Sequence, residues 1–176
     1  MKRGIALETE DRKLQALVLA LAIRENISLP NLGRLTSFGF VRRREERALA
    51  QRYIEALSVR TPSMEQKVVN LSGGNQQKVV LAKWLALNPK VLIVDEPTRG
   101  IDIGAKAEVH SLLSQLAESG VAVLMISSEL PEVLHMSDRI YVMREGKMAG
   151  VIDRSEATEE RIMELATGIM SGARAA

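Results

Sequence analysis

Two short segments of the chain carry residue types that suit phosphate and metal chemistry. Ser72, Gly73 and Gly74 precede an apolar helical pattern, so their amides would lie at a helix N-terminus, which carries a partial positive charge of about half a unit. Asp95 and Glu96 follow an uninterrupted apolar run. A carboxylate at the end of a buried strand can hold Mg²⁺, and its neighbour can accept a proton from water. Together the segments predict a site for a phosphorylated ligand that reacts with water.

Each segment alone also has an ordinary structural explanation. A Ser-Gly-Gly sequence before a helix is most often a plain turn, and two acids after a strand often cap the next helix. Leu71 and Gln76 flank the first segment, and the acidic pair follows some twenty positions later. This order and spacing favour the functional interpretation, which is the far half of a site that hydrolyses a nucleotide.

The near half of such a site is a glycine-rich loop with the pattern G-x-x-x-x-G-K-[ST]. Its amides and lysine hold the triphosphate. None of the twelve glycines stands in that pattern. We therefore expect that the chain cannot complete a phosphate site from its own residues and does not bind MgATP tightly alone.

Composition excludes several other classes of protein. The absence of cysteine rules out disulfides and thiolate metal sites and fits a cytoplasmic setting. The net charge of +2 is too small to argue for nucleic acid, and we expect none as a partner. The longest apolar run, 16–23, is well short of the ~20 residues of a membrane-spanning helix.

The elements expected to position these residues change along the chain from mostly helical to alternating strand and helix. Apolar spacing predicts strands at 4–7, 91–94 and 121–126, helices at 42–57, 72–87, 105–119 and 158–167, a short helix at 130–135, and a hairpin of 140–143 with 148–152. Strand 91–94 has no polar interruption, which is typical of a strand covered on both faces of a parallel sheet. The fold class predicted is α/β. The expected divisions are a first strand and loop at 1–13, a helical subdomain at 14–88, a parallel-sheet half at 89–153, and a C-terminal helix and tail at 154–176.

The motifs resemble those of the ATP-binding-cassette ATPases. Segment 71–76 resembles the signature motif of that family, and 91–95 resembles its Walker B strand. The similarity is closer to the C-terminal cassette of the tandem ATP-binding subunit of bacterial monosaccharide importers of the ribose, galactose and xylose type. Segments 10–13, 24–27 and 127–132 also resemble segments of that cassette, so the resemblance covers nearly the whole chain.

The resemblance implies a partial P-loop fold that lacks the Walker A portion, with ATP and Mg²⁺ as ligands. It also implies a role for each matching residue. Glu96 is the catalytic glutamate, Asp95 holds Mg²⁺ through water, Glu10 stands at the Q-loop position, and Ser128 stands at the switch position, where most of the family has histidine. Gly100, Ile101 and Asp102 form the D-loop, and the signature residues that face a partner's γ-phosphate are Leu71, Ser72, Gly73, Gly74, Asn75 and Gln76.

Such cassettes work in head-to-tail pairs, so the resemblance implies a partner cassette with an intact Walker A loop. It further implies transmembrane permease subunits contacted near residues 14–40, indirectly a sugar-binding protein, and a peripheral place on the cytoplasmic face of the bacterial inner membrane. The chain is then expected to be truncated before its own Walker A loop. Two alternatives stay open: a non-catalytic regulatory or interaction module, and a DNA-repair or chromosome ATPase, although no heptad array of a long coiled coil is present.

Overall fold

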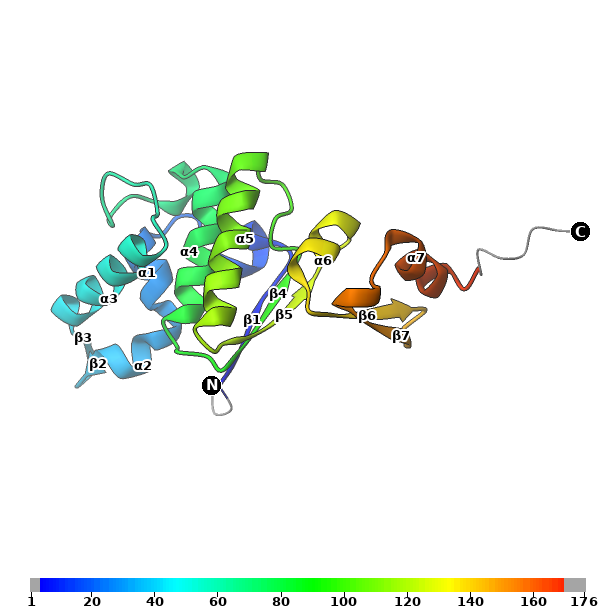
Figure 1. Ribbon diagram of the computed structural model, residues 1–176. Coiled ribbons are helices and arrows are strands. Elements are labelled where there is room, and N and C mark those ends of the chain that lie inside the picture. Colours follow the sequence, from blue (N-terminus) through cyan, green and yellow to red (C-terminus); the bar gives the residue numbers. More distant parts are fainter. Residues whose placement is uncertain (1–3, 170–176) are drawn as a thin grey trace, which may run out of the picture. The chain divides into compact units, whose positions relative to one another are not determined.

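The computed structural model describes residues 4–169 of the 176-residue chain (Figure 1). These residues form two compact units, 4–126 and 127–169. Helices of the first half pack on the parallel sheet, and the two hairpin strands pair with each other. The divisions predicted at 13, 88 and 153 follow motif boundaries and stay predictions. The elements of the first unit are β1 (Ile5–Glu8), η1 (Arg12–Ala16), α1 (Ile23–Ser28), η2 (Leu29–Asn31), α2 (Leu32–Leu35), β2 (Thr36–Ser37), β3 (Phe40–Val41), α3 (Arg43–Ala56), η3 (Val68–Asn70), α4 (Gly73–Leu85), β4 (Val91–Asp95), α5 (Ile103–Glu118) and β5 (Ala122–Ile126). The second unit contains α6 (Leu130–Met136), β6 (Arg139–Arg144), β7 (Lys147–Asp153), η4 (Arg154–Glu156) and α7 (Glu159–Thr167).

The first unit is built on a parallel sheet of order β1-β4-β5. In its register Leu7 pairs with Ile93, and Ile93 pairs with Leu124. The strand β4 therefore has a neighbour on each side and delivers Asp95 at the carboxyl edge. This arrangement confirms the predicted α/β class.

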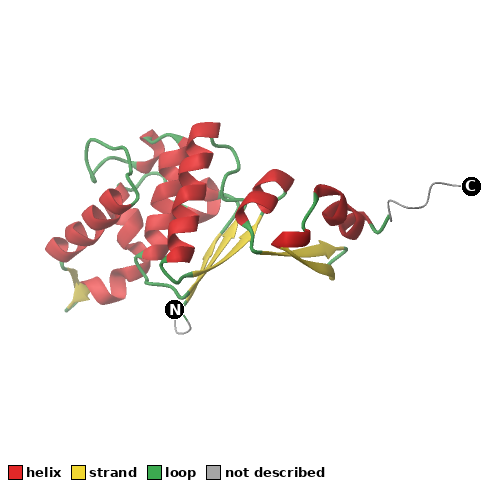
Figure 2. Cartoon of the chain, in the orientation of Figure 1, coloured by secondary structure: helices red, strands yellow, loops and turns green. Residues whose placement is uncertain are grey.

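One face of this sheet is covered and the other is open within the described residues. The residues Ala6, Leu92 and Val94 are fully buried on the covered face, where α4 packs on β1 and α5 packs on β5 (Figures 1 and 2). Large apolar side chains lie about half exposed on the other face: Ile5, Leu7, Leu124 and Ile126. The prediction that strand 91–94 is covered on both faces is thus wrong for residues 4–169, because an apolar run looks the same whether or not a second layer covers it.

The helix α4 forms the centre of the first unit. It packs against α1 and α3 as well as β1 and α5. The four residues from Val79 to Ala82 are all fully buried. A helix buried on nearly all sides has no amphipathic stripe, which agrees with the continuous apolar sequence of this segment.

The helix α3 confirms the helix predicted at 42–57, but its buried face differs. The apolar spacing of this segment predicts one face with Leu49, Tyr53, Ala56 and Leu57. Tyr53 and Leu57 are buried, whereas Ala56 is exposed and Glu46 is buried. Glu46 is stabilised there by an ion pair with Arg24 of α1 at 2.5 Å and by the hydroxyl of Ser28 at 2.8 Å. A buried carboxylate is tolerated when it has a charged partner. The buried face of α3 is therefore determined by this ion pair as well as by the apolar residues.

A small antiparallel hairpin, β2–β3, precedes α3. Phe38 lies at its turn with φ of 49° and is fully exposed, and Phe40 is 80% exposed. The side chain of Arg42 donates to the carbonyl of Arg34 and pairs with Glu45 at 2.6 Å. The hairpin therefore presents the only two phenylalanines of the chain to solvent.

The second unit joins the hairpin β6–β7 to α6 and α7. Its core consists of Ile140, Val142, Ile152 and Ile162. The Thr158 hydroxyl caps α7 by accepting from the amide of Arg161 at 3.1 Å, and Gly168 ends the helix with φ of 74°. The hairpin and the last helix are thus confirmed. Among the helices within residues 4–169, none has the length and apolar character needed to cross a membrane.

Candidate functional site

The N-terminus of α4 is accessible at the predicted anion-binding turn. Ser72 occupies the N-cap position and is exposed, and Gly73 is half-buried. The Ser72 hydroxyl accepts from the side-chain amide of Asn75 at 3.0 Å instead of capping a backbone amide. The first-turn amides of a helix have no carbonyl within the helix to donate to, so this turn suits an approaching anion.

The remaining residues of the motif hold this turn in place. Leu71 and Gln76 are buried, and Gln76 donates to the carbonyls of Val68 and Leu71 at 3.2 and 3.3 Å. The side-chain oxygen Oδ1 of Asn75 accepts from the backbone amide of Arg60 at 2.8 Å. Their side chains therefore support the loop, and the surface offered to a ligand comes from Ser72 and the glycine backbone.

Close packing requires the glycine at position 74 and leaves little room for a side chain at position 73. A Cβ atom at Gly74 would lie 2.5 Å from the Cβ of Ala105, so α4 and α5 approach each other only because this position lacks a side chain. A Cβ atom at Gly73 would lie 3.1 Å from the guanidinium of Arg12 and 3.3 Å from the carbonyl of Gly100. The signature turn thus contacts the turn that follows β4.

The two acids lie where the sequence predicts them, at the carboxyl end of β4. Asp95 is half-buried, and its register position opposite Ile126 places it on the open face of the sheet. Glu96 is half-buried and has φ of 50°; its amide donates to the carbonyl of Ile126 at 2.9 Å. A non-glycine residue in left-handed backbone is uncommon and is often found at functional sites.

The segment after these acids is a tight turn that leads into α5. Arg99 donates its amide to the carbonyl of Glu96 at 3.1 Å, and Gly100 has φ of 67°. Asp102 caps α5, because its carboxylate accepts from the amide of Ala105 at 2.9 Å. Ile101 is half-buried, so the predicted D-loop residues form an ordered turn.

Glu10 lies beside this turn and forms an ion pair with Arg99. A hollow of about 300 Å³ is lined by charged side chains at this place: Glu10, Asp11, Arg12, Lys13 and Arg99. Asp11 accepts from the amides of Lys13 and Leu14, both at 3.0 Å, and so begins the short π-helical turn η1. The sequence predicted only a charged loop here.

Glu8 was missed by the sequence analysis and is buried at the end of β1. It is 1% exposed on the covered face, where Gln77 of α4 donates to its carboxyl group. Burial raises the pKa of Glu8 to about 8, against the opposing effects of Gln77 and the nearby Arg12. Its place two residues after Ala6 in an alternating strand is the signal that could have identified it.

The Glu8 carboxyl is expected to make stability depend on pH. Because its pKa is 4.5 in the unfolded chain and about 8 in the folded chain, its contribution is fully present below pH 4.5 and is lost as pH rises to about 8. Glu8→Gln should remove this loss, so the variant gains about 1.4 kcal/mol over wild type for each pH unit in that window. Urea unfolding from pH 5 to pH 8.5 measures the difference, with the exposed Glu118→Gln as the control. Parallel pH profiles for wild type and Glu8→Gln would contradict the assignment.

Two lysines of α4 were also unexpected as buried groups. The Lys83 ammonium donates to the carbonyl of Ala16 at 2.6 Å, and burial lowers the pKa of Lys83. The Lys78 ammonium pairs with Glu108 of α5 at 2.7 Å and donates to the carbonyl of Ser58 at 3.0 Å. These contacts fasten the signature helix to its neighbours.

Ser128 belongs to the second unit, between β5 and α6. The neighbouring Ser127 hydroxyl accepts from the amide of Glu129 at 3.0 Å, which begins α6 with an ordered turn. The role of Ser128 at a switch position stays a prediction.

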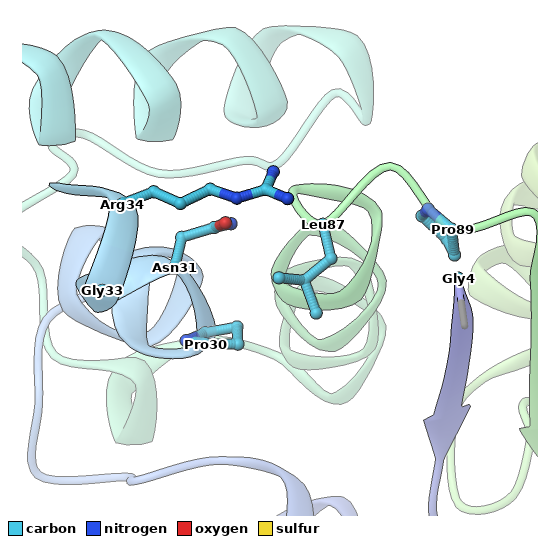
Figure 3. A pocket seen from close by; sticks show the side chains of 7 residues that line it. All are labelled: Gly4, Pro30, Asn31, Gly33, Arg34, Leu87 and Pro89. Carbon is cyan, nitrogen blue, oxygen red and sulfur yellow. The ribbon is translucent and has the colours of Figure 1, made fainter. Parts of the chain in front are cut away.

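A separate cavity of about 210 Å³ lies at the opposite edge of the sheet (Figure 3). It is lined by Gly4 and Pro89, which precede β1 and β4, together with residues from α2 and the end of α4 such as Arg34 and Leu87. Asp95 lies at the other end of β4, so this cavity is not part of the candidate site.

No group of three His, Asp or Glu side chains that could hold a metal occurs within residues 4–169. A Mg²⁺ ion does not require such a group, because it keeps several waters and often binds one or two carboxylates plus substrate phosphates. The half-buried carboxylate of Asp95 at a strand end fits that mode of binding.

Comparisons with known proteins identify the family of the chain. The family model described as ABC transporter matches residues 4–99. Over 165 residues the chain is 58% identical to a protein of Pseudomonas syringae pv. tomato described as a ribose/galactose/methyl galactoside import ATP-binding protein, covering 94% of this chain and 31% of that protein. It is 52% identical over 168 residues to the ribose import ATP-binding protein of Bacillus licheniformis, covering 96% and 34%. The chain thus spans about a third of the length of these relatives.

Solved structures share the fold. The dimeric post-hydrolysis state of an ATP-binding cassette bound to ADP and Pi superposes with a TM-score of 0.72 at 24% identity, covering 87% of this chain and 64% of that one. A component of an ABC transporter complex from Clostridium perfringens gives a TM-score of 0.72 at 22% identity, covering 88% and 59%. The parallel sheet with its helical region is therefore the fold of these cassettes, and with more than half of its residues matched by the family model, the chain belongs to the ABC transporter family.

Proposed function

We propose that the chain is the signature-bearing and acid-bearing part of an ATPase cassette that couples ATP binding and hydrolysis to sugar import. The observation that carries this proposal is the contact between the N-terminus of α4 and the turn that follows the acids of β4. Gly73 packs against Gly100 and Ile101 in that contact. A ligand-binding turn and a pair of carboxylates are thereby held by one rigid part of the molecule.

In this proposal the amides and hydroxyl at Ser72 and Gly73 bind the γ-phosphate of ATP held by a partner cassette. Exposure of Ser72 and the positive end of α4 support this assignment. Leu71, Asn75 and Gln76 act by holding the turn, since their hydrogen bonds and burial engage them with the protein itself.

Asp95 and Glu96 are proposed to act on a second ATP whose phosphates are held by a lysine loop on the open face of the sheet. Asp95 would hold Mg²⁺ through water, and the ion would neutralise charge on the phosphates. Glu96 would accept a proton from water as the water oxygen bonds to the γ-phosphorus and the bond to the leaving ADP oxygen breaks. The place of Asp95 at the carboxyl end of β4, where parallel sheets bind ligands, supports this role.

The proposed partners are a cassette with an intact lysine loop and transmembrane permease subunits, with a sugar-binding protein acting through the permease. The exposed hairpin at Phe38 and Phe40 supports a permease contact near residues 14–40, because clustered exposed aromatics mark interaction sites. The proposed location is peripheral, at the cytoplasmic face of the inner membrane.

Mixing this chain with a cassette that carries an intact lysine loop tests the proposal. ATP turnover that depends on the added chain should fall by about 100-fold or more in Ser72→Arg, because the long side chain fills the anion turn and the donor geometry is lost. Phosphate release is measured at saturating MgATP.

The matched control is Ser111→Arg, which adds the same side chain at an exposed position in α5. It should keep wild-type turnover. If the wild-type chain gives no dependent turnover, or if Ser72→Arg matches wild type, the proposed function is wrong.

A further inference from the structure

Arg12 has no role in the motifs described above. Its side chain nevertheless connects three segments of the candidate site. Its guanidinium donates to the carbonyl of Arg99 at 2.7 Å and to the carbonyl of Gly100 at 3.0 Å. The same guanidinium would lie 3.1 Å from a Cβ atom at Gly73, the first residue of α4. One side chain from η1 thus contacts both the turn after the acids and the signature turn.

The two residues that precede Arg12 reinforce this arrangement. Glu10 forms an ion pair with the Arg99 side chain, so residue 99 is held through both its side chain and its carbonyl. Asp11 caps η1 through the amides of Lys13 and Leu14, which fixes the direction in which Arg12 leaves the chain. Arginine suits this place, because its planar fork can donate to two carbonyls at once.

We propose that Arg12 is a positioning residue that sets the turn 99–101 against the N-terminus of α4, so that the signature surface is ordered before a partner cassette arrives. Arg12 touches no reacting atom in this role. It acts through the carbonyls of Arg99 and Gly100 and through its packing on Gly73. The inference rests on the proposed function, because ordering of this surface matters only if a partner's ATP binds there.

Ordering the turn before binding strengthens the affinity for the partner cassette more than it changes the rate of ATP hydrolysis. The reason is that the conformational entropy of the turn has already been lost before the partner binds. Removing the two hydrogen bonds should therefore weaken pairing and leave the rate within the formed pair nearly unchanged. The appropriate readout separates these quantities: turnover of a lysine-loop cassette at saturating MgATP is measured against increasing concentrations of this chain.

We expect Arg12→Met, which keeps much of the side-chain volume, to raise the half-saturating concentration of the chain by about tenfold. The turnover at saturation should stay within about threefold of wild type. Arg12→Lys retains the charge and one donor direction, so it should fall between wild type and Arg12→Met. The control Lys13→Met removes the neighbouring cation, and we expect it to follow the wild-type curve.

The thermal unfolding of each variant is measured alongside the titration. If Arg12→Met unfolds at a lower temperature than wild type, the titration of Arg12→Lys tests the proposal instead. A lowered plateau with an unchanged half-saturating concentration would overturn the proposal in favour of a direct catalytic role. A wild-type curve for a folded Arg12→Met, or an equal effect of Lys13→Met, would also overturn it. These outcomes differ from failure of the proposed function, in which wild type itself supports no turnover.

Discussion

Glu96→Gln is expected to lower ATP turnover by about 100-fold to 10,000-fold while leaving the fold intact, because a general base in this position supplies a factor of that size. Glutamine keeps the shape of the side chain and the left-handed backbone at this residue, but its amide cannot accept a proton from water. The measurement requires a lysine loop in the same cassette. Residues 4–169 are therefore grafted in place of the matching segment of a cassette that carries such a loop.

Two controls isolate the site that contains Glu96. The grafted cassette is paired with a cassette whose general-base carboxylate is replaced by its amide, so that only one site can turn over. Glu118→Gln, an exposed carboxylate at the end of α5, should leave turnover unchanged. Turnover in Glu96→Gln equal to that of Glu118→Gln would remove Glu96 from the catalytic role.

Glu46→Ala is expected to lower the free energy of unfolding by about 3 kcal/mol, since breaking one side of a buried ion pair leaves the other charge without compensation. The group left behind is the buried guanidinium of Arg24, which pairs with Glu46 at 2.5 Å. Its remaining partners, Glu65 and Glu25, are 44% and 40% exposed and can compensate only in part. The Ser28 hydroxyl also loses its carboxylate acceptor and keeps only the carbonyl of Glu25. Urea unfolding at pH 7 measures the change.

The neighbouring Glu45→Ala is the matched control. Glu45 pairs with Arg42 on the exposed face of the same helix, and such pairs contribute about 0.5 kcal/mol or less. Replacing Arg24 and Glu46 together by methionine should recover most of the loss, because two apolar groups of similar size leave no buried charge. A double variant that is less stable than Glu46→Ala would contradict this explanation.

Local patterns predicted the elements that carry the candidate site. The start of α4 follows from Ser72 and two glycines before an apolar helix, and β4 follows from an apolar run that ends in Asp95. The capped helix α7 was predicted for the same reason, since Thr158 and Gly168 act on their own neighbours in sequence. Such signals need no knowledge of distant partners.

Contacts between distant residues could not be predicted in this way. Glu46 is buried because Arg24 lies 22 positions earlier, and Glu8 is buried because Gln77 comes from a helix 69 positions away. A charged residue normally indicates an exposed position, so both were assigned to the surface or to a loop. The left-handed backbone conformation of Glu96 could not be predicted from the residue type, because glutamate rarely adopts it.

The central position of β4 in the parallel sheet determines how firmly the two acids are held. Asp95 ends a strand that is hydrogen-bonded to β1 and to β5, and the amide of Glu96 donates to the carbonyl of Ile126 on β5. Opening this end of β4 requires breaking bonds to two strands, so local unfolding here is costly. The two carboxylates therefore keep a constant reference position while the exposed segments of the chain fluctuate.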